Sequence, residues 1–324
     1  MTRKSFEEKL ARLKSLERES PSDSAVHEIR QALSGSSNIL AAQGARTVAK
    51  WGLSDLAPEI VSAFNRHMEN PVKRDPGCHA KIAAIEALNA LDCPDSEILL
   101  RGIRHIQMEP SYGPPVDTAD LLRAACAFGL SQLGHPELLC EMVTLLMDSK
   151  AAARRAAVRV LIDIGRETSE MLLRLKVLQG DSEPEILGDC LAGLFAIAPA
   201  RSLRFAEQFL SADNPGIIEE AALAIGNSRL KEAFGILRDC RERNILPAMK
   251  RMLLLPIALT RCESAFMFLL EVVQNERIDD AIAAIEAAAI FCINPESRDQ
   301  IRDAAFRRND EEIIEVYNKR IAQP

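Results

Sequence analysis

A motif of small and apolar residues recurs along most of the 324-residue chain. The segment 122–134 (LRAACAFGLSQLG) aligns without gaps with 154–165 (RRAAVRVLIDIG), and the same frame fits 81–92 (KIAAIEALNALD). Weaker copies end near five further positions: Gly52, Ala198, Arg229, Thr260 and Cys292. After the first three units the copies end about 31 to 33 residues apart, a period typical of helical repeats. This period restricts the fold to a stack of similar units, because one unit alone cannot bury its apolar face.

Each copy has the pattern of one amphipathic helix that follows another. Within 153–164, Ala157 and Leu161 fall on the apolar stripe of a helix, whereas Arg155 and Arg159 fall on the opposite side. Further amphipathic segments precede the copies, for example 137–147, 201–210 and 263–273. Only 4% of the residues are aromatic, and β-branched residues are sparse, which favours helices. The sequence predicts an all-α, right-handed α-solenoid of about eight helical-hairpin repeats, without a β-sheet.

The two ends of the chain have the pattern of capping helices. We expect one domain over 1–324, with an N-terminal helix in 1–22, repeats in 23–293 and capping helices in 294–324. Apolar residues at both ends are spaced to cover the terminal repeats: Phe6, Leu10, Leu13, Leu16, Ile301, Ala304, Ala305, Ile313, Ile314 and Tyr317. Within the seventh unit, Pro256 predicts a kink or a break, because proline removes a hydrogen bond of the helix.

The repeat motif resembles the short HEAT-like repeats of phycobilin lyases, whose second helix reads roughly hydrophobic-Arg-x-x-Ala-Ala-x-Ala-Leu-Gly-x-Ile-Gly. Segments 122–134 and 154–165 match it best, and the resemblance extends over 23–293. It implies a HEAT-like fold. The repeat arginine in that family commonly bonds within or between repeats, so the resemblance implies a scaffold role for Arg123 and Arg154. Many scaffold proteins of unrelated function share the motif, which is therefore specific for fold alone.

Two repeats are longer than the others by about nine residues each. The additional residues are 70–78 (NPVKRDPGC) and 108–119 (MEPSYGPPVDTA), each between the first and the second helix of its unit. Equivalent turns of successive repeats lie on one edge of a solenoid, so we expect the two loops to be neighbours. Five prolines restrict them to few backbone conformations, which lowers the entropic cost of binding.

The inserted loops collect residue types that are rare elsewhere in the chain. The candidate binding residues are Arg74, Asp75, His79, His105, Glu109, Tyr112 and Asp117, together with Arg155 and Arg159 on the adjoining second helix. Tyrosine is enriched at binding hot spots, and Tyr112 between Ser111 and Gly113 should be exposed. In an alternative interpretation the histidines pack, Asp117 or Thr118 caps the helix near Ala119, and the prolines only end helices.

No arrangement of residues indicates a metal or a cofactor. Deoxyhypusine hydroxylases are helical-repeat enzymes that hold two irons with several His-Glu dipeptides, whereas this chain has only His27-Glu28. The best set for zinc is His67, Cys78, His79 and His105, and its spacing fits no zinc motif. We therefore expect no metal, no cofactor and no catalysis.

Nucleic acid is an unfavourable partner for this composition. The net charge is −7, and Trp51 is the only tryptophan, so stacking platforms of the kind used by HEAT-like alkylpurine DNA glycosylases are scarce. The resemblance also implies an alternative, a lyase-like chaperone that holds an open-chain tetrapyrrole. The sequence favours a non-catalytic scaffold that binds another protein.

The compartment can be predicted from the N-terminal segment and the cysteines. Residues 1–20 are charged throughout and lack the apolar core of a secretory signal, and no later apolar run is long enough to cross a bilayer. Eight cysteines lie in helical stretches with no Cys-x-x-Cys pair, which is typical of buried thiols in a reducing compartment. We expect a cytoplasmic protein without membrane insertion.

Overall fold

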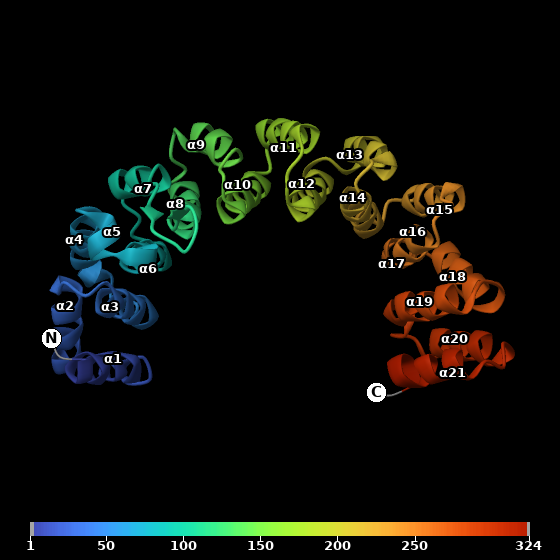
Figure 1. Ribbon diagram of the computed structural model, residues 1–324, viewed down its shortest axis with the longest axis horizontal. Coiled ribbons are helices and arrows are strands. Elements are labelled where there is room, and N and C mark those ends of the chain that lie inside the picture. Colours follow the sequence, from blue (N-terminus) through green and yellow to red (C-terminus); the bar gives the residue numbers. More distant parts are fainter. Residues whose placement is uncertain (1–2, 323–324) are drawn as a thin grey trace. The chain divides into compact units, whose positions relative to one another are not determined.

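The computed structural model describes residues 3–322, almost all of which form paired helices. The chain divides into two compact units, Met1–Ile164 and Gly165–Pro324. Each unit is a stack of helical pairs in which the first helices form one row and the second helices another (Figure 1). The predicted all-α repeat architecture is confirmed, and the single domain over 1–324 stays a prediction.

The first unit contains one terminal helix, α1 (Arg3–Leu16), and four helical pairs. The first helices of the pairs are α2 (Asp23–Ser34), α4 (Ala57–Met68), α7 (Ser96–Ile103) and α9 (Leu138–Leu145). The second helices are α3 (Asn38–Trp51), α6 (His79–Ala90), α8 (Asp120–Leu133) and α10 (Ala151–Ile164). The inserted segments of this unit hold the short helix α5 (Pro71–Arg74) and the strands β1 (Met108–Glu109) and β2 (Val116–Asp117).

The second unit contains four further pairs and two terminal helices. The first helices are α11 (Glu167–Gln179), α13 (Pro199–Glu207), α15 (Ala233–Arg243) and α18 (Glu263–Asn275). The second helices are α12 (Pro184–Ile197), α14 (Pro215–Ser228), α16 (Pro247–Met252) with α17 (Leu254–Leu259), and α19 (Ile278–Ala288). The chain continues with α20 (Pro295–Arg307), α21 (Glu311–Tyr317) and a π-helical turn, Asn318–Ala322. The eight predicted pairs and the terminal helices are therefore present.

Polar residues in the turns set where the helices begin. The hydroxyl groups of Ser22 and Ser37 accept hydrogen bonds from backbone N–H groups at the starts of α2 and α3. The carboxylate of Asp95 does the same for two N–H groups of α7. Such caps satisfy donors that have no partner inside the helix and contribute about 1 kcal/mol each.

Pro256 divides the second helix of the seventh pair, as predicted. The break separates α16 from α17 at Leu253, three residues before the proline. Pro256 has no backbone N–H and therefore cannot donate to a carbonyl of the preceding turn. The proline carbonyl also packs closely against α14: a Cβ atom at Gly226 would lie 2.2 Å from the oxygen of Pro256. Glycine at position 226 therefore allows α14 and α17 to approach each other.

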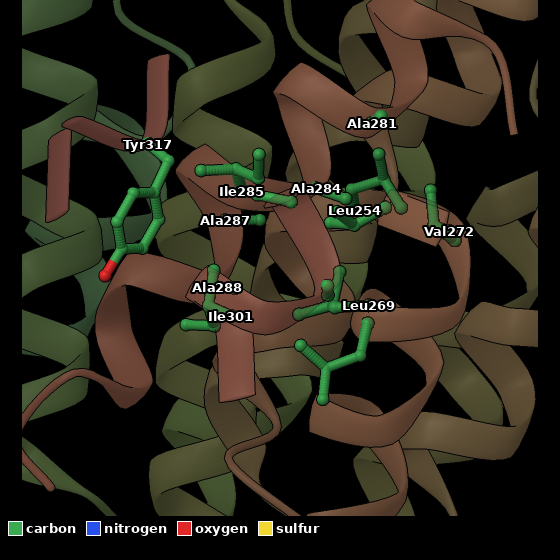
Figure 2. Packing of buried hydrophobic residues seen from close by; sticks show 14 of the residues in the cluster. Leu254, Leu269, Val272, Ala281, Ala284, Ile285, Ala287, Ala288, Ile301 and Tyr317 are labelled. Atoms are coloured by element: carbon green, nitrogen blue, oxygen red, sulfur yellow. The ribbon is translucent and has the colours of Figure 1, made fainter. Parts of the chain in front are cut away.

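The C-terminal helices close the apolar core of the second unit. Figure 2 shows Leu254, Leu269 and Ile285 packed together with Ile301 and Tyr317. These side chains come from α17, α18, α19, α20 and α21, so α20 and α21 cover the apolar side of the last repeat. The expected terminal capping helices are therefore present in the second unit, whereas the bounds 294–324 stay a prediction.

The cysteine expectation is confirmed in part. All eight thiols are free, and Cys78, Cys126, Cys190 and Cys240 are buried. Burial raises the pKa of Cys78 to about 11, which makes this thiol a poor nucleophile. Cys140 is exposed, so the prediction of a buried thiol is wrong there.

Candidate functional site

The two inserted loops lie side by side, as the repeat register predicted. One loop, 69–78, connects α4 to α6, and the other, 104–119, connects α7 to α8. The backbone N–H of Gly77 donates to Glu109 Oε1 at 2.7 Å, and Gln107 Nε2 donates to the carbonyl of Asp75 at 2.9 Å. We call the surface formed by these two loops the insertion edge.

A buried ion pair fixes the base of the insertion edge. Lys81 and Asp75 are both fully buried, and Lys81 Nζ lies 3.1 Å from Asp75 Oδ2. The ammonium also donates to Gln107 Oε1 at 2.9 Å, so it joins both loops. The Asp75 carboxylate accepts from the N–H groups of Ala80 and Lys81 at the start of α6. These additional hydrogen bonds offset the cost of removing both charges from water.

A buried arginine, Arg123, connects the insertion edge to the next repeat. Arg123 Nη2 donates to Asp117 Oδ2 at 2.7 Å, and its Nε donates to Asp148 Oδ2 at 2.7 Å. Asp148 lies in the turn between α9 and α10. Arg154 is also buried and donates to the carbonyl of Asp148 at 2.9 Å. Both arginines therefore have the structural role that the family resemblance implied.

These contacts form one continuous series across the four repeats of the first unit. The series begins where Asn38 Nδ2 donates to Asp75 Oδ1 at 3.0 Å, and the two halves join where the N–H of Gln107 donates to Asp117 Oδ1 at 3.1 Å. We call this series the polar chain, and its members are Asn38, Asp75, Lys81, Gln107, Asp117, Arg123 and Asp148. It holds the inserted loops against the scaffold.

Lys81 belongs to the polar chain but was not among the candidate residues. A signal for it was present, because Lys81 occupies the same column of the repeat alignment as Arg123 and Arg154. A cation at that column in three repeats indicates a shared structural role, although its carboxylate partner differs in each repeat.

The backbone of the first loop adopts left-handed conformations at three positions. Asn70, Gly77 and Cys78 have φ angles of 48°, 74° and 56°. A left-handed residue other than glycine costs about 1 kcal/mol, and the contacts of the polar chain offset this cost. The loop is therefore held in one specific conformation.

The second loop contains a short β-ribbon, which corrects the expectation of a fold without any sheet. Strands β1 and β2 pair antiparallel, with Met108 opposite Asp117 and Glu109 opposite Val116. At the tip, Ser111 Oγ donates to the carbonyl of Pro114 at 2.7 Å and accepts from the N–H of Gly113. The ribbon forms because the inserted segment is long enough to turn back on itself between two fixed ends.

Two of the candidate binding residues lie in the interior. Asp75 and Asp117 are buried, and their carboxylates bond to the polar chain and to backbone N–H groups. Burial alone would raise the pKa of Asp117, but hydrogen bonds from Arg123 and from backbone N–H groups outweigh it and lower this pKa. Direct contact of Asp75 or Asp117 with a partner, as the sequence suggested, does not fit this burial.

Two further candidates are half-buried and also bond inside the insertion edge. The His105 ring lies 3.2 Å from Gln107 Oε1, and burial lowers its pKa. Burial would raise the pKa of Glu109, but hydrogen bonds from Gly77, Gln107 and Thr118 lower it. His105 and Glu109 therefore support the loops from below.

The remaining candidates lie on the surface, namely Arg74, His79, Tyr112, Arg155 and Arg159. The Tyr112 side chain is fully exposed at the ribbon tip, as expected. Arg74 pairs with Glu69 at 2.6 Å. Other exposed apolar side chains of the two loops are Val72, Ile106, Met108 and Val116. The sequence missed these four, because apolar residues in a loop are exposed or buried according to contacts that the pattern does not encode.

Neither a metal site nor a membrane-spanning helix is found within 3–322. His, Cys, Asp and Glu side chains of these residues form no group of three or more that could hold a metal ion. Over the same range, every helix is too short or too polar to cross a bilayer.

His67 makes the stability of this region depend on pH. Its ring is buried beneath the first loop, and among the described residues neither ring nitrogen has a hydrogen-bond partner. Burial lowers the pKa of His67 below its ordinary value of 6.5. As the pH falls below about 6.5, His67 therefore binds a proton in the unfolded chain but stays neutral in the folded chain.

We expect the free energy of unfolding to decrease between about pH 7 and pH 5, by at most about 1.4 kcal/mol per pH unit from His67. Urea unfolding at several pH values measures this slope. His67→Gln should make the slope shallower, whereas His27→Gln, at an exposed position, should leave it unchanged. Equal slopes in the wild type and in His67→Gln would show that other groups cause the dependence.

Comparisons with known proteins give only a loose structural likeness. No family model and no curated protein matches the sequence. The CpcE–CpcF complex of phycocyanin lyase from Nostoc sp. PCC7120 is 14% identical with a TM-score of 0.35, covering 71% of this chain and 88% of that chain. An engineered protein is 14% identical with a TM-score of 0.37, covering 97% and 94%.

Human deoxyhypusine hydroxylase in complex with glycerol is 18% identical with a TM-score of 0.32, covering 77% of this chain and 88% of that chain. Structural similarity with TM-scores this low says nothing about the site. The helical-repeat architecture rests on the helices of the chain itself.

Proposed function

We propose that this protein is a non-catalytic scaffold that binds another protein through the insertion edge and the adjoining surface of α10. The observation that carries this proposal is the arrangement of the two loops. They are fixed from below by the polar chain and present Tyr112 with four other exposed apolar side chains at the surface. A site held in its bound conformation loses little entropy on association.

The composition of the insertion edge supports a protein partner. Exposed aromatic and methionine side chains beside charged groups are typical of the centre of protein interfaces. Tyr112 lies at the tip of the ribbon, and Met108 and Val116 lie on its two strands. Arg155 and Arg159 add exposed cations on α10. The lyase-like alternative has no comparable support, because nothing distinguishes a tetrapyrrole pocket among the described residues.

Affinity capture from native cell extract, followed by mass spectrometry, tests the proposal. We expect a reproducible protein partner that the wild type retains and the double variant Tyr112→Ala with Arg74→Glu loses. A coloured tetrapyrrole on the purified protein would favour the lyase-like function instead. Nucleic acid that dissociates with increasing salt would favour the nucleic-acid alternative.

Tyr112→Ala alone should weaken binding of the captured partner by about 1 to 2 kcal/mol, or roughly 5- to 30-fold in Kd, because the side chain acts as an anchor. Isothermal titration calorimetry measures the change. The midpoint of urea unfolding should barely move, since the side chain makes no buried contact. Ile245→Ala, at a similarly exposed apolar position in the second unit, is the matched control. If Tyr112→Ala and Arg74→Glu both leave the partner affinity unchanged while substitutions on the opposite edge abolish binding, the two loops are only spacers.

A further inference from the structure

The four second helices of the first unit present one common exposed face. Helices α3, α6, α8 and α10 pack against one another in this order and lie in one row in Figure 1. Each inner helix of this row is covered by a second helix on either side and by first helices behind it, so one stripe remains exposed. We call the surface formed by these stripes the second-helix face. Its exposed charged and large apolar residues are Arg46, Lys50, His79, Glu86, Leu121, Phe128, Arg155, Arg159 and Asp163.

The centre of the second-helix face is apolar. Leu121 and Phe128 lie seven residues apart on α8 and are 54% and 36% exposed. Seven residues are about two helical turns, so both side chains belong to the same stripe, about 10 Å apart. Large apolar side chains next to each other on an exposed helix stripe mark an interaction surface when charged residues border them.

Cations lie on α10, next to this apolar centre, and on α3, which is separated from it by α6 and its exposed Glu86. Arg159 projects from α10, and Arg46 and Lys50 project from α3. Within 3–322 these three cations have no ion-pair partner, whereas Arg12, Arg30, Arg74 and Arg104 are paired. The chain as a whole carries a net charge of −7. Two exposed carboxylates, Glu86 and Asp163, lie on the same face, which leaves an excess of positive charge there. Such an excess on an acidic protein favours a negatively charged partner.

We propose that the second-helix face binds an acidic segment of another protein that inserts an apolar side chain between Leu121 and Phe128. This inference rests on the scaffold function proposed above and names the chemistry of its partner. The flanking cations on α3 and α10 would pair with carboxylates on either side of the apolar anchor.

The spacing of the helices sets the length of the segment. Neighbouring packed helices lie 8 to 10 Å apart, so Arg159 and Arg46 are separated by roughly 25 to 30 Å across three helix spacings. An extended peptide covers this distance with about eight to nine residues. The apolar anchor lies nearer the carboxylates that face α10 than those that face α3.

Nucleic acid fits the second-helix face less well than an acidic peptide. Glu86 and Asp163 lie on the same face and would repel the phosphate that every nucleotide carries, whereas a peptide can place uncharged residues opposite these two carboxylates. Phe128 is its only exposed aromatic side chain, which gives no row of platforms for stacked bases.

Fluorescence anisotropy with the full chain and four labelled probes tests the proposal. The first probe is a synthetic peptide with Glu and Asp on both sides of a central Leu-Phe pair. The second replaces Leu-Phe with Ser-Ser, the third replaces each acid with Lys, and the fourth is single-stranded DNA. We expect the first peptide to bind at least about tenfold more tightly than the others, with an affinity that falls as salt increases.

Variants of the second-helix face should selectively weaken binding of the first peptide. We expect Phe128→Ser and the double variant Arg46→Glu with Arg159→Glu each to raise its Kd about tenfold or more. Leu175→Ser and Lys9→Glu, which change an exposed leucine and an exposed lysine elsewhere, should leave the Kd unchanged. Circular dichroism and the unfolding midpoint identify any variant that fails to fold, and Leu121→Ser then replaces Phe128→Ser.

Several results would overturn the inference. These are equal binding of the serine or the lysine peptide, tighter binding of DNA, an unchanged Kd in the face variants, or no binding of the first peptide. If a partner captured from extract is lost in the Tyr112 variant while Phe128→Ser retains it, the scaffold function stands and this inference fails. If no protein partner is captured at all, the proposed function itself fails.

Discussion

Replacing Asp75 with alanine should lower the free energy of unfolding by about 3 to 5 kcal/mol, because it leaves the buried Lys81 ammonium without its carboxylate. The substitution also removes the hydrogen-bond acceptor at the start of α6. Urea unfolding followed by circular dichroism measures the loss. Asp55→Ala, at an exposed position in the same unit, should change the free energy by less than about 0.5 kcal/mol.

A double-mutant cycle with Lys81→Met identifies the cause of this loss. If the unpaired ammonium is responsible, Asp75→Ala should cost much less in a chain that already carries methionine at position 81. An equal cost in both backgrounds would show that the loss comes from the helix cap alone.

Leu161→Ala should destabilise the first unit by about 2 to 5 kcal/mol, through lost burial and the cavity that remains. Leu161 is fully buried on α10. The matched control is Leu133→Ala, the same change on an exposed side chain of α8, which should cost little. The urea midpoints of both variants measure the difference. Partner affinity should remain unchanged for Leu161→Ala molecules that stay folded, and a selective loss of binding would show that α10 packing shapes the site.

The sequence predicted those features that depend on local pattern. The small-residue motif located the paired helices, Pro256 predicted the break between α16 and α17, and the repeat register placed the loops 70–78 and 108–119 beside each other. Each of these features follows from the period of the repeat or from the covalent chemistry of one residue.

The sequence failed where burial depends on side-chain contacts that the repeat pattern does not encode. Aspartate is usually found at the surface, but ion pairs with Lys81 and Arg123 hold Asp75 and Asp117 in the interior. The ammonium of Lys81 donates to Gln107, 26 residues away, and the local sequence does not reveal this contact. The β-ribbon was missed because two-residue strands have no periodic signal.

The polar chain also determines how the first unit opens. In a stack joined only by apolar contacts, a terminal repeat can separate and leave its neighbour intact. Here Asn38, Gln107 and Arg123 connect successive repeats, so opening one repeat exposes a buried charge or amide of the next. Local opening then costs nearly as much as opening several repeats together. The loops that carry the partner site therefore belong to a cooperatively folded part of the chain, and their geometry persists as long as that part remains folded.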